Sequence, residues 1–127
     1  MRILVADDGP AARALMRRLL ELEGYIVRTA LDGLEAIEAA RQWQPDLILM
    51  DLHMPVCDGI EATRMLQADP VTFEIPVIAL TASNGADEVR DAFEAGCIGH
   101  LSKPIEVAHL VRQLEAWIRA RRAPVAV

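Results

Sequence analysis

Short apolar runs recur along the chain, separated by segments with helical spacing. Four of them contain few or no polar residues: Ile3 to Ala6, Leu47 to Met50, Val77 to Leu80, and the weaker run Cys97 to Leu101. Runs of this kind are typical of strands that are buried on both faces of a parallel sheet. The segment from Tyr25 to Thr29 is more polar, and this indicates a fifth strand at the edge of the sheet.

Five segments between and after these runs have the spacing of amphipathic helices. We expect the first helix to begin at Pro10, whose missing N–H has no cost in a first turn, and to end at Gly24. Its apolar face is predicted to contain Leu15, Leu19 and Leu22, flanked by Met16 and Leu20. The remaining helices are predicted around Ala36 to Ala40, from a cap at Asp58 to Leu66, from Val89 to Gly96, and from Val107 to Ile118.

Strand and helix therefore alternate five times, which predicts an α/β fold with a doubly wound parallel sheet and helices on both faces. A length of 127 residues fits a single domain. We assign residues 1–122 to this domain and residues 123–127 to a C-terminal tail.

Composition and charge exclude several classes of protein. The chain is 53% hydrophobic and 25% charged, with no apolar run near the roughly 20 residues of a membrane span. Its net charge of −6 disfavours direct binding to nucleic acid. Acids at positions 7 and 8 come too early for a signal peptide. Two cysteines, Cys57 and Cys97, are expected to be free thiols of a cytoplasmic protein.

Polar residues with chemical capacity follow the ends of four predicted strands. Asp7 and Asp8 follow the first strand, Asp51 the third, Thr81 the fourth and Lys103 the last. Because the carboxyl ends of parallel strands lie at one edge of the sheet, we expect these side chains to converge on one crevice.

Three carboxylates in one crevice repel one another unless a proton or a cation lies among them. Hard oxygen ligands in an open site favour Mg²⁺, which keeps several waters and binds phosphate oxygens. A lysine and a hydroxyl would add positive charge and a donor for phosphoryl oxygens. A carboxylate nucleophile, a metal and such donors are what phosphoryl transfer requires.

With these motifs in view, the chain resembles a response-regulator receiver domain over nearly its whole length. The motifs that carry the resemblance are Val5-Ala6-Asp7-Asp8, Met50-Asp51-Leu52-His53-Met54-Pro55, Asp58-Gly59, Leu80-Thr81-Ala82 and Leu101-Ser102-Lys103-Pro104. The segment from Asp51 to Arg64 is similar to receivers that are fused to hybrid sensor kinases. The resemblance implies a flavodoxin-like (βα)5 fold with strand order 2-1-3-4-5.

The resemblance also implies a role for each residue of the crevice. Asp51 would accept a phosphoryl group from a phosphohistidine or a small donor. Asp8 would bind Mg²⁺ directly and Asp7 mainly through water, while the backbone carbonyl of His53 would complete the protein ligands. No organic cofactor is implied.

Further residues would assist or modulate this chemistry. Thr81 and Lys103 would contact the phosphoryl oxygens, and the bond between Lys103 and Pro104 would be cis. The side chains of His53 and Ser83 can border the path of an attacking water, where His53 could slow the attack by its bulk or help to orient the water. We therefore expect both residues to modulate the rate of phosphoryl loss.

The sequence departs from the family pattern at His100, where many receivers carry Tyr or Phe. That aromatic ring moves inward with the threonine on phosphorylation, as a packing switch. His100 can follow the same path, or it can be an ordinary strand residue. We expect His109 to be a polar residue on an exposed helix face.

Two other functions are compatible with a crevice of this kind. A phosphatase with an aspartyl nucleophile often has a second acid two residues later, but His53 stands there. A flavodoxin-like cofactor-binding module needs a phosphate-cradling glycine loop after the first strand, where this chain has two acids. The signalling receiver, with only self-phosphorylation and autodephosphorylation as its own activities, is therefore favoured.

The resemblance implies a histidine kinase or a histidine phosphotransfer protein as partner. The face made by the fourth helix, the fifth strand and the fifth helix would bind an output partner or a second copy. No output domain is apparent in the 127 residues, and Met1 together with the tail to Val127 favours a stand-alone regulator over a domain excised from a longer protein.

Overall fold

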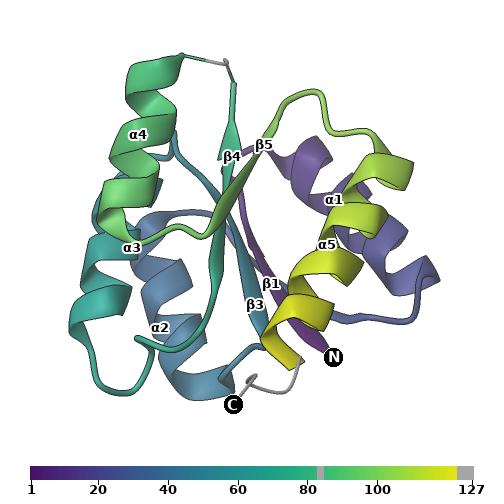
Figure 1. Cartoon of the computed structure of the whole chain (residues 1–127), viewed down its shortest axis with the longest axis horizontal. Helices are drawn as coiled ribbons and strands as arrows, with labels where there is room; N and C mark the ends of the chain where they lie inside the picture. The colour runs from purple at the N-terminus through teal and green to yellow at the C-terminus, as the bar shows by residue number, and fades with distance from the viewer. Residues whose placement is uncertain (83–84, 123–127) are drawn as a thin grey trace.

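The computed structural model describes residues 1–82 and 85–122, so Ser83 and the tail over residues 123–127 lie outside the described residues. Strands and helices alternate along the described chain (Figure 1). The strands are β1 (Arg2–Ala6), β2 (Ile26–Ala30), β3 (Leu47–Asp51), β4 (Val77–Thr81) and β5 (Gly99–Ser102). The helices are α1 (Pro10–Leu22), α2 (Gly33–Trp43), α3 (Gly59–Ala68), α4 (Ala86–Ala95) and α5 (Val107–Arg122).

All neighbouring strands pair in parallel, in the order β2-β1-β3-β4-β5. This confirms the predicted doubly wound α/β fold, including the edge position of the more polar strand β2. Because the chain runs from β1 outward to β2 and then returns to place β3 on the other side of β1, the strand order reverses between β1 and β3. A crevice is expected at this point, beyond the carboxyl ends of these two strands.

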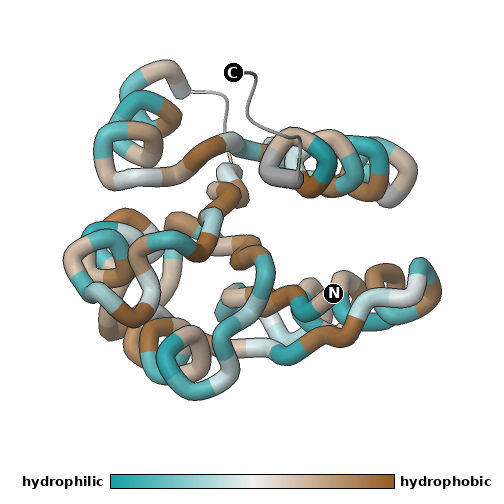
Figure 2. Tube along the Cα trace, turned by 60° about the horizontal axis from the view of Figure 1, so that its bottom comes forward, coloured by the Kyte–Doolittle hydropathy of each residue, from teal (hydrophilic) through white to brown (hydrophobic). Residues whose placement is uncertain are grey.

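Alternate residues of the central strands feed two hydrophobic cores, one on each face of the sheet. Leu4 and Ile48 pack in the core beneath α2, α3 and α4. Ile3 and Leu49 pack in the core beneath α1 and α5. Figure 2 shows hydrophobic and hydrophilic residues along the turns of the helices, as expected where one side faces a sheet and the other faces water. Within the described ranges, no helix combines the length and apolarity that a membrane span requires.

The predicted apolar face of α1 is wrong in part. Leu15 is 59% exposed and Leu22 is 73% exposed, whereas Met16 and Leu20 are buried against the sheet. The spacing of apolar residues fits two adjacent stripes of this helix, and the angle at which the helix lies on the sheet selects one of them. The predicted end is confirmed, because Gly24 follows the helix with φ of +95°.

The last strand begins two residues later than predicted, at Gly99. Gly96, expected within the fourth helix, is its C-terminal cap with φ of +122°. Cys97 and Ile98 belong to the connection between α4 and β5. A side chain at position 99 would meet the ring of Trp117 at 2.5 Å, so only glycine allows α5 to lie this close to β5.

The loop between β3 and α3 contains a strained residue. Val56 has φ of +69°, and the N–H of Cys57 donates a 2.7 Å hydrogen bond to the carbonyl of Pro55 across it. This is a γ-turn with a left-handed central residue, a conformation that β-branched residues rarely adopt. The Val56 side chain is 76% exposed, so little packing offsets the strain.

Replacing Val56 with glycine should therefore stabilise the protein. Relief of strain, of order 1–3 kcal/mol, exceeds the roughly 0.5–1 kcal/mol by which glycine favours the unfolded chain, so we expect a gain of about 1 kcal/mol. Urea denaturation of Val56→Gly should show a higher midpoint. Val56→Ala, which keeps the Cβ atom, should gain less, and a lower midpoint for the glycine variant would contradict the prediction.

Candidate active site

Two buried aspartates lie side by side where the strand order reverses. Ala6 and Met50 are paired in the sheet, so the next residues, Asp7 and Asp51, emerge together at its carboxyl edge. Asp7 is 3% exposed and Asp51 is 4% exposed, while Asp8 is exposed to solvent. One carboxylate oxygen from each of the three residues lies within 4.8 Å of the others. The predicted convergence of these acids is confirmed.

Lys103 lies between the two buried carboxylates. Its Nζ donates to Oδ2 of Asp7 and to Oδ2 of Asp51, each at 3.0 Å. Burial alone would lower the pKa of the Lys103 ammonium, but the hydrogen bonds and negative charges of the two aspartates outweigh burial and raise it. The lysine is therefore held as a cation that compensates part of the negative charge in the crevice.

Asp51 binds its proton more tightly than an ordinary aspartate. Burial raises the pKa of this carboxyl, and the charge of Asp7 adds to the effect. The backbone N–H of His53, 3.1 Å from Oδ1, and the ammonium of Lys103 act in the opposite direction without cancelling it. The Asp51 carboxylate is thus poorly solvated, as suits a group that gains a bond to an electrophile.

Thr81 contributes a hydroxyl at the end of β4. The residue is fully buried, and its Oγ1 has no hydrogen-bond partner among the residues that the structure describes. A buried hydroxyl without a partner costs roughly 1–3 kcal/mol, so its position calls for an explanation. Thr81 directly follows Leu80, which pairs with Asp51 in the sheet, so the hydroxyl lies at the same edge as the aspartate.

Two features at the start of α3 hold the loop after Asp51 in place: a glycine contact that sequence reasoning missed, and the predicted cap at Asp58. A Cβ atom on Gly59 would lie 2.2 Å from the carbonyl oxygen of Asp51, so α3 can begin against this strand only with glycine. The side chain of Asp58 caps the same helix by accepting from the N–H of Glu61. The motif Asp58-Gly59 carried this signal, but only the packed structure shows which backbone the glycine meets.

Two hydrogen bonds fix the position of Asp7 at the end of β1. Arg13 of α1 donates to the backbone carbonyl of Asp7 at 2.8 Å, and the N–H of Gly9 donates to Oδ1 of Asp7 at 2.9 Å. Arg13 was not among the predicted site residues, because its contact is with backbone and depends on how α1 lies across the end of β1.

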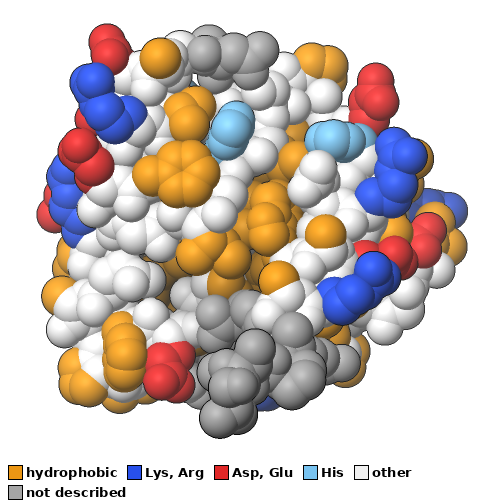
Figure 3. All heavy atoms as spheres, in the orientation of Figure 1, with side chains coloured by type: hydrophobic (Ala, Val, Ile, Leu, Met, Phe, Trp, Pro, Cys, Tyr) orange, Lys and Arg blue, Asp and Glu red, His pale blue; other side chains and the backbone are white. Residues whose placement is uncertain are grey.

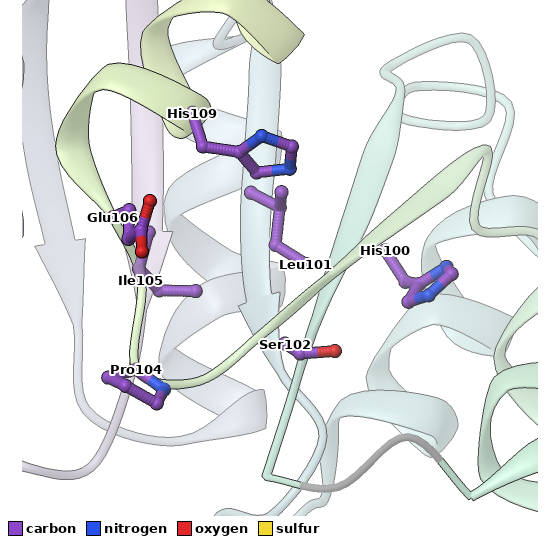
Figure 4. A pocket seen from close by; sticks show the side chains of 7 residues that line it. All are labelled: His100, Leu101, Ser102, Pro104, Ile105, Glu106 and His109. Atoms are coloured by element: carbon purple, nitrogen blue, oxygen red, sulfur yellow. The ribbon is translucent and has the colours of Figure 1, made fainter.

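The positions of Pro104 and His109 agree with the sequence-based predictions for the end of the chain. The Lys103–Pro104 peptide bond is cis, as predicted. A cavity of about 380 Å³ lies between β5 and α5 and is lined by His100, Ser102, Pro104 and His109, among others (Figure 4). His109 is exposed, as predicted, and His100 points from β5 toward α4, where its ring meets Phe93 edge-on with 6.1 Å between ring centres.

The donor atoms of the crevice fit a divalent cation with oxygen ligands. Carboxylates from Asp7, Asp8 and Asp51 are hard donors, and their spacing lets them share one ion of the size of Mg²⁺. The exposed position of Asp8 leaves the site open to solvent, as an ion that retains waters requires.

Comparison with known proteins identifies the family. A family model described as "Response regulator receiver domain" matches residues 3–115. This chain belongs to that family. It is a receiver domain of the kind found in two-component response regulators, and nothing in the comparisons favours a phosphatase.

Relatives of known name support the same conclusion. The chain is 34% identical to the polar-differentiation response regulator DivK of Brucella anthropi, with 91% of this chain and 94% of the relative covered. It is 38% identical to the DNA-binding dual master transcriptional regulator RpaA of Synechocystis sp., over 93% of this chain and 49% of the relative. The chain thus spans about half the length of that regulator and of the similarly matched PrrA proteins of mycobacteria.

Solved structures agree in fold. The receiver domain of a sensor histidine kinase from Pseudomonas aeruginosa, described with a magnesium ion coordinated in its active site cleft, superposes with a TM-score of 0.86 at 36% identity, covering 92% of this chain and 96% of that one. The chemotaxis protein CheY4 of Vibrio cholerae gives a TM-score of 0.86 at 29% identity, covering 91% and 96%.

The raised pKa of Asp51 predicts a dependence of stability on pH. A proton binds this carboxyl more tightly in the folded protein, so stability falls as pH rises through the folded pKa and is regained as pH falls below the ordinary value. Without added metal, Asp51→Asn should therefore be more stable than the native chain at pH 7, on the order of 1 kcal/mol or about 4 °C in Tm.

The comparison of melting curves at pH 7 and near pH 4 measures this effect, with Glu94→Gln as a control for loss of one charge from an exposed position. The advantage of Asp51→Asn should shrink at the lower pH. An equal advantage at both pH values, or the same gain in the control, would show that ionisation of Asp51 is not its source.

Proposed function

We propose that this receiver domain accepts a phosphoryl group on Asp51 from a phosphohistidine, in a two-component system or phosphorelay, and that phosphorylation changes which partner it binds. One observation carries the proposal. The poorly solvated carboxylate of Asp51 accepts a hydrogen bond from a lysine ammonium at 3.0 Å, and at the same edge of the sheet a threonine has a buried hydroxyl without a partner within the described chain.

Transfer would proceed by attack of an Asp51 carboxylate oxygen on phosphorus. The bond from phosphorus to the donor's imidazole nitrogen breaks, and its electron pair stays with that nitrogen, leaving an acyl phosphate on Asp51. Lys103, already hydrogen-bonded to Asp51, would keep its charge beside the phosphoryl oxygens. The Thr81 hydroxyl, which has no partner in the described chain, would donate a hydrogen bond to one of these oxygens. This bond would remove the cost of burying the hydroxyl without a partner.

Mg²⁺ would be the cofactor of this reaction. Asp8 and Asp51 would bind it directly, Asp7 mainly through water, and the His53 backbone carbonyl would complete the set. The ion would supply positive charge that offsets both the acidic cluster and the phosphoryl oxygens. Receiver domains bind Mg²⁺, and the donor set of this chain is of the type that the ion prefers.

The domain's own activities would be limited to self-phosphorylation from small donors and autodephosphorylation. No second acid follows Asp51 at the position where an aspartyl phosphatase has its general acid, since His53 stands there. We assign His53 and Ser83 to the modulation of phosphoryl loss. Buried free thiols at Cys57 and Cys97 suit action in the cytoplasm.

We assign the switch to His100. Thr81 pairs with Ser102 in the sheet, two residues beyond His100, so movement of Thr81 toward a phosphoryl group would be felt along β5. The His100 ring contacts Phe93 of α4, and this contact would be exchanged when the ring moves inward. Pro104 would anchor the end of the same segment.

The surface over α4, β5 and α5 would receive the output partner or a second copy. Figure 3 shows hydrophobic side chains lining a hollow between α4 and α5. Phe93 of α4, whose ring meets that of His100 on β5, is 45% exposed on this surface, so a large apolar side chain is available there for contact with a partner.

The phosphohistidine donor would approach from the side of α1. An apolar cavity of about 200 Å³ between α1 and the start of α5 is lined by Leu15, Ile105 and the site residues Asp7 and Lys103. A donor that delivers phosphorus to Asp51 must cover surface next to these residues. The large exposed fraction of Leu15 would then be buried by the donor.

The central test is uptake of a phosphoryl group. Incubation with acetyl phosphate and Mg²⁺ should add the mass of one phosphoryl group to the intact chain. No gain should occur without Mg²⁺ or in Asp51→Asn, which lacks the nucleophile. A gain that persists in Asp51→Asn would place the acceptor elsewhere, and no gain in the native chain even from a phosphohistidine protein would overturn the proposed function.

Transfer from a phosphorylated histidine phosphotransfer domain should depend on Leu15. A charge at this position would face the donor, so Leu15→Arg should slow transfer from phosphohistidine by about tenfold or more, and by more than it slows labelling by acetyl phosphate. Leu22→Arg, the same change at another exposed position about 10 Å farther along the same helix, should not have this effect. Equal losses in the two variants would argue against docking at this end of α1.

A further inference from the structure

His53 is held at both ends, through its backbone and through its ring. Its backbone N–H donates to Oδ1 of Asp51, while its ring Nε2 lies 3.1 Å from Oε1 of Glu88, 35 residues later in the first turn of α4. The Glu88 side chain is 21% exposed and that of His53 is 66% exposed, so the carboxylate is the better fixed of the two groups.

The contact joins the two chain segments that border the candidate site. The loop after β3 carries the acceptor, and α4 begins shortly after Thr81 at the end of β4. A free imidazole at an exposed position would sample several rotamers. The hydrogen bond to Glu88 selects the one in which the ring spans from the acceptor loop to α4.

We propose that Glu88 is a positioning residue that sets the lifetime of the phosphoryl group on Asp51 by holding the His53 imidazole across this gap. The inference rests on the proposed function. In the hydrolysis that ends the signal, water attacks phosphorus and the bond to the Asp51 oxygen breaks. Inorganic phosphate then leaves, the carboxylate is restored, and the water's proton passes to solvent. A ring fixed between the loop and α4 narrows the path of that water.

The contact does not depend on one charge state of the imidazole. A neutral ring with its proton on Nε2 and a protonated ring both donate to a carboxylate. A glutamine at position 88 also presents an acceptor oxygen at similar reach, so it should hold the ring without the negative charge. An alanine removes both the acceptor and the charge.

The test measures decay of the phosphorylated chain after loading with acetyl phosphate and Mg²⁺ and removal of the donor. Glu88→Ala should lose the phosphoryl group about three- to fivefold faster than the native chain, as expected for loss of one exposed pair. Glu88→Gln should decay within about twofold of the native rate, because its amide oxygen can still accept the hydrogen bond from the His53 ring and only the exposed charge is lost. Glu94→Ala, which removes an exposed acid from the same helix, should not change the rate.

A double-mutant cycle with His53→Ala separates positioning from a structural effect on α4. If Glu88 acts through the imidazole, Glu88→Ala should have no further effect once His53 is alanine. Unchanged or slower decay in Glu88→Ala, equal decay in Glu88→Gln and Glu88→Ala, or persistence of the effect in the His53→Ala background would each overturn the inference. Failure of the proposed function differs, because the native chain itself would then take up no phosphoryl group.

Discussion

The hydrogen bonds from Lys103 to two buried carboxylates are the interaction on which the rest of the site depends. Asp7 and Asp51 are almost fully buried and lie next to each other, an arrangement that repulsion and desolvation would both oppose without a cation. The lysine reaches them from the end of β5, 96 residues after Asp7. The acidic crevice is therefore compensated only when the last strand is in the sheet, which ties formation of the site to completion of the fold.

Two groups near this edge of the sheet are held in unfavourable states. Thr81 keeps a buried hydroxyl without a partner in the described chain, and Val56 keeps a strained backbone in the acceptor loop. Both are costs that the two well-packed cores on either side of the sheet can offset. A group that gave the threonine an acceptor would change the balance of these costs at the carboxyl end of β4, which leads toward α4 and pairs with β5.

Much of this could be predicted because its signals are local. Buried parallel strands require apolar runs, helix ends require Pro10, Asp58 or Gly24, and the carboxyl ends of the strands place Asp51, Thr81 and Lys103 at one edge whatever the packing. The sequence could not decide which of two equally apolar sides of a helix packs against the sheet. Two apolar stripes were available on α1, and the packed helix exposes Leu15 and buries Met16.

The sequence by itself determined the alternation of strands and helices, the family and the set of residues at the carboxyl edge, because each follows from a periodicity or a motif of a few residues. Only the tertiary structure decided that Gly59 must clear the carbonyl of Asp51, that Lys103 bridges two aspartates and that Glu88 meets His53. These contacts join segments far apart in the chain, and their existence depends on distances that are fixed only when both faces of the sheet are packed.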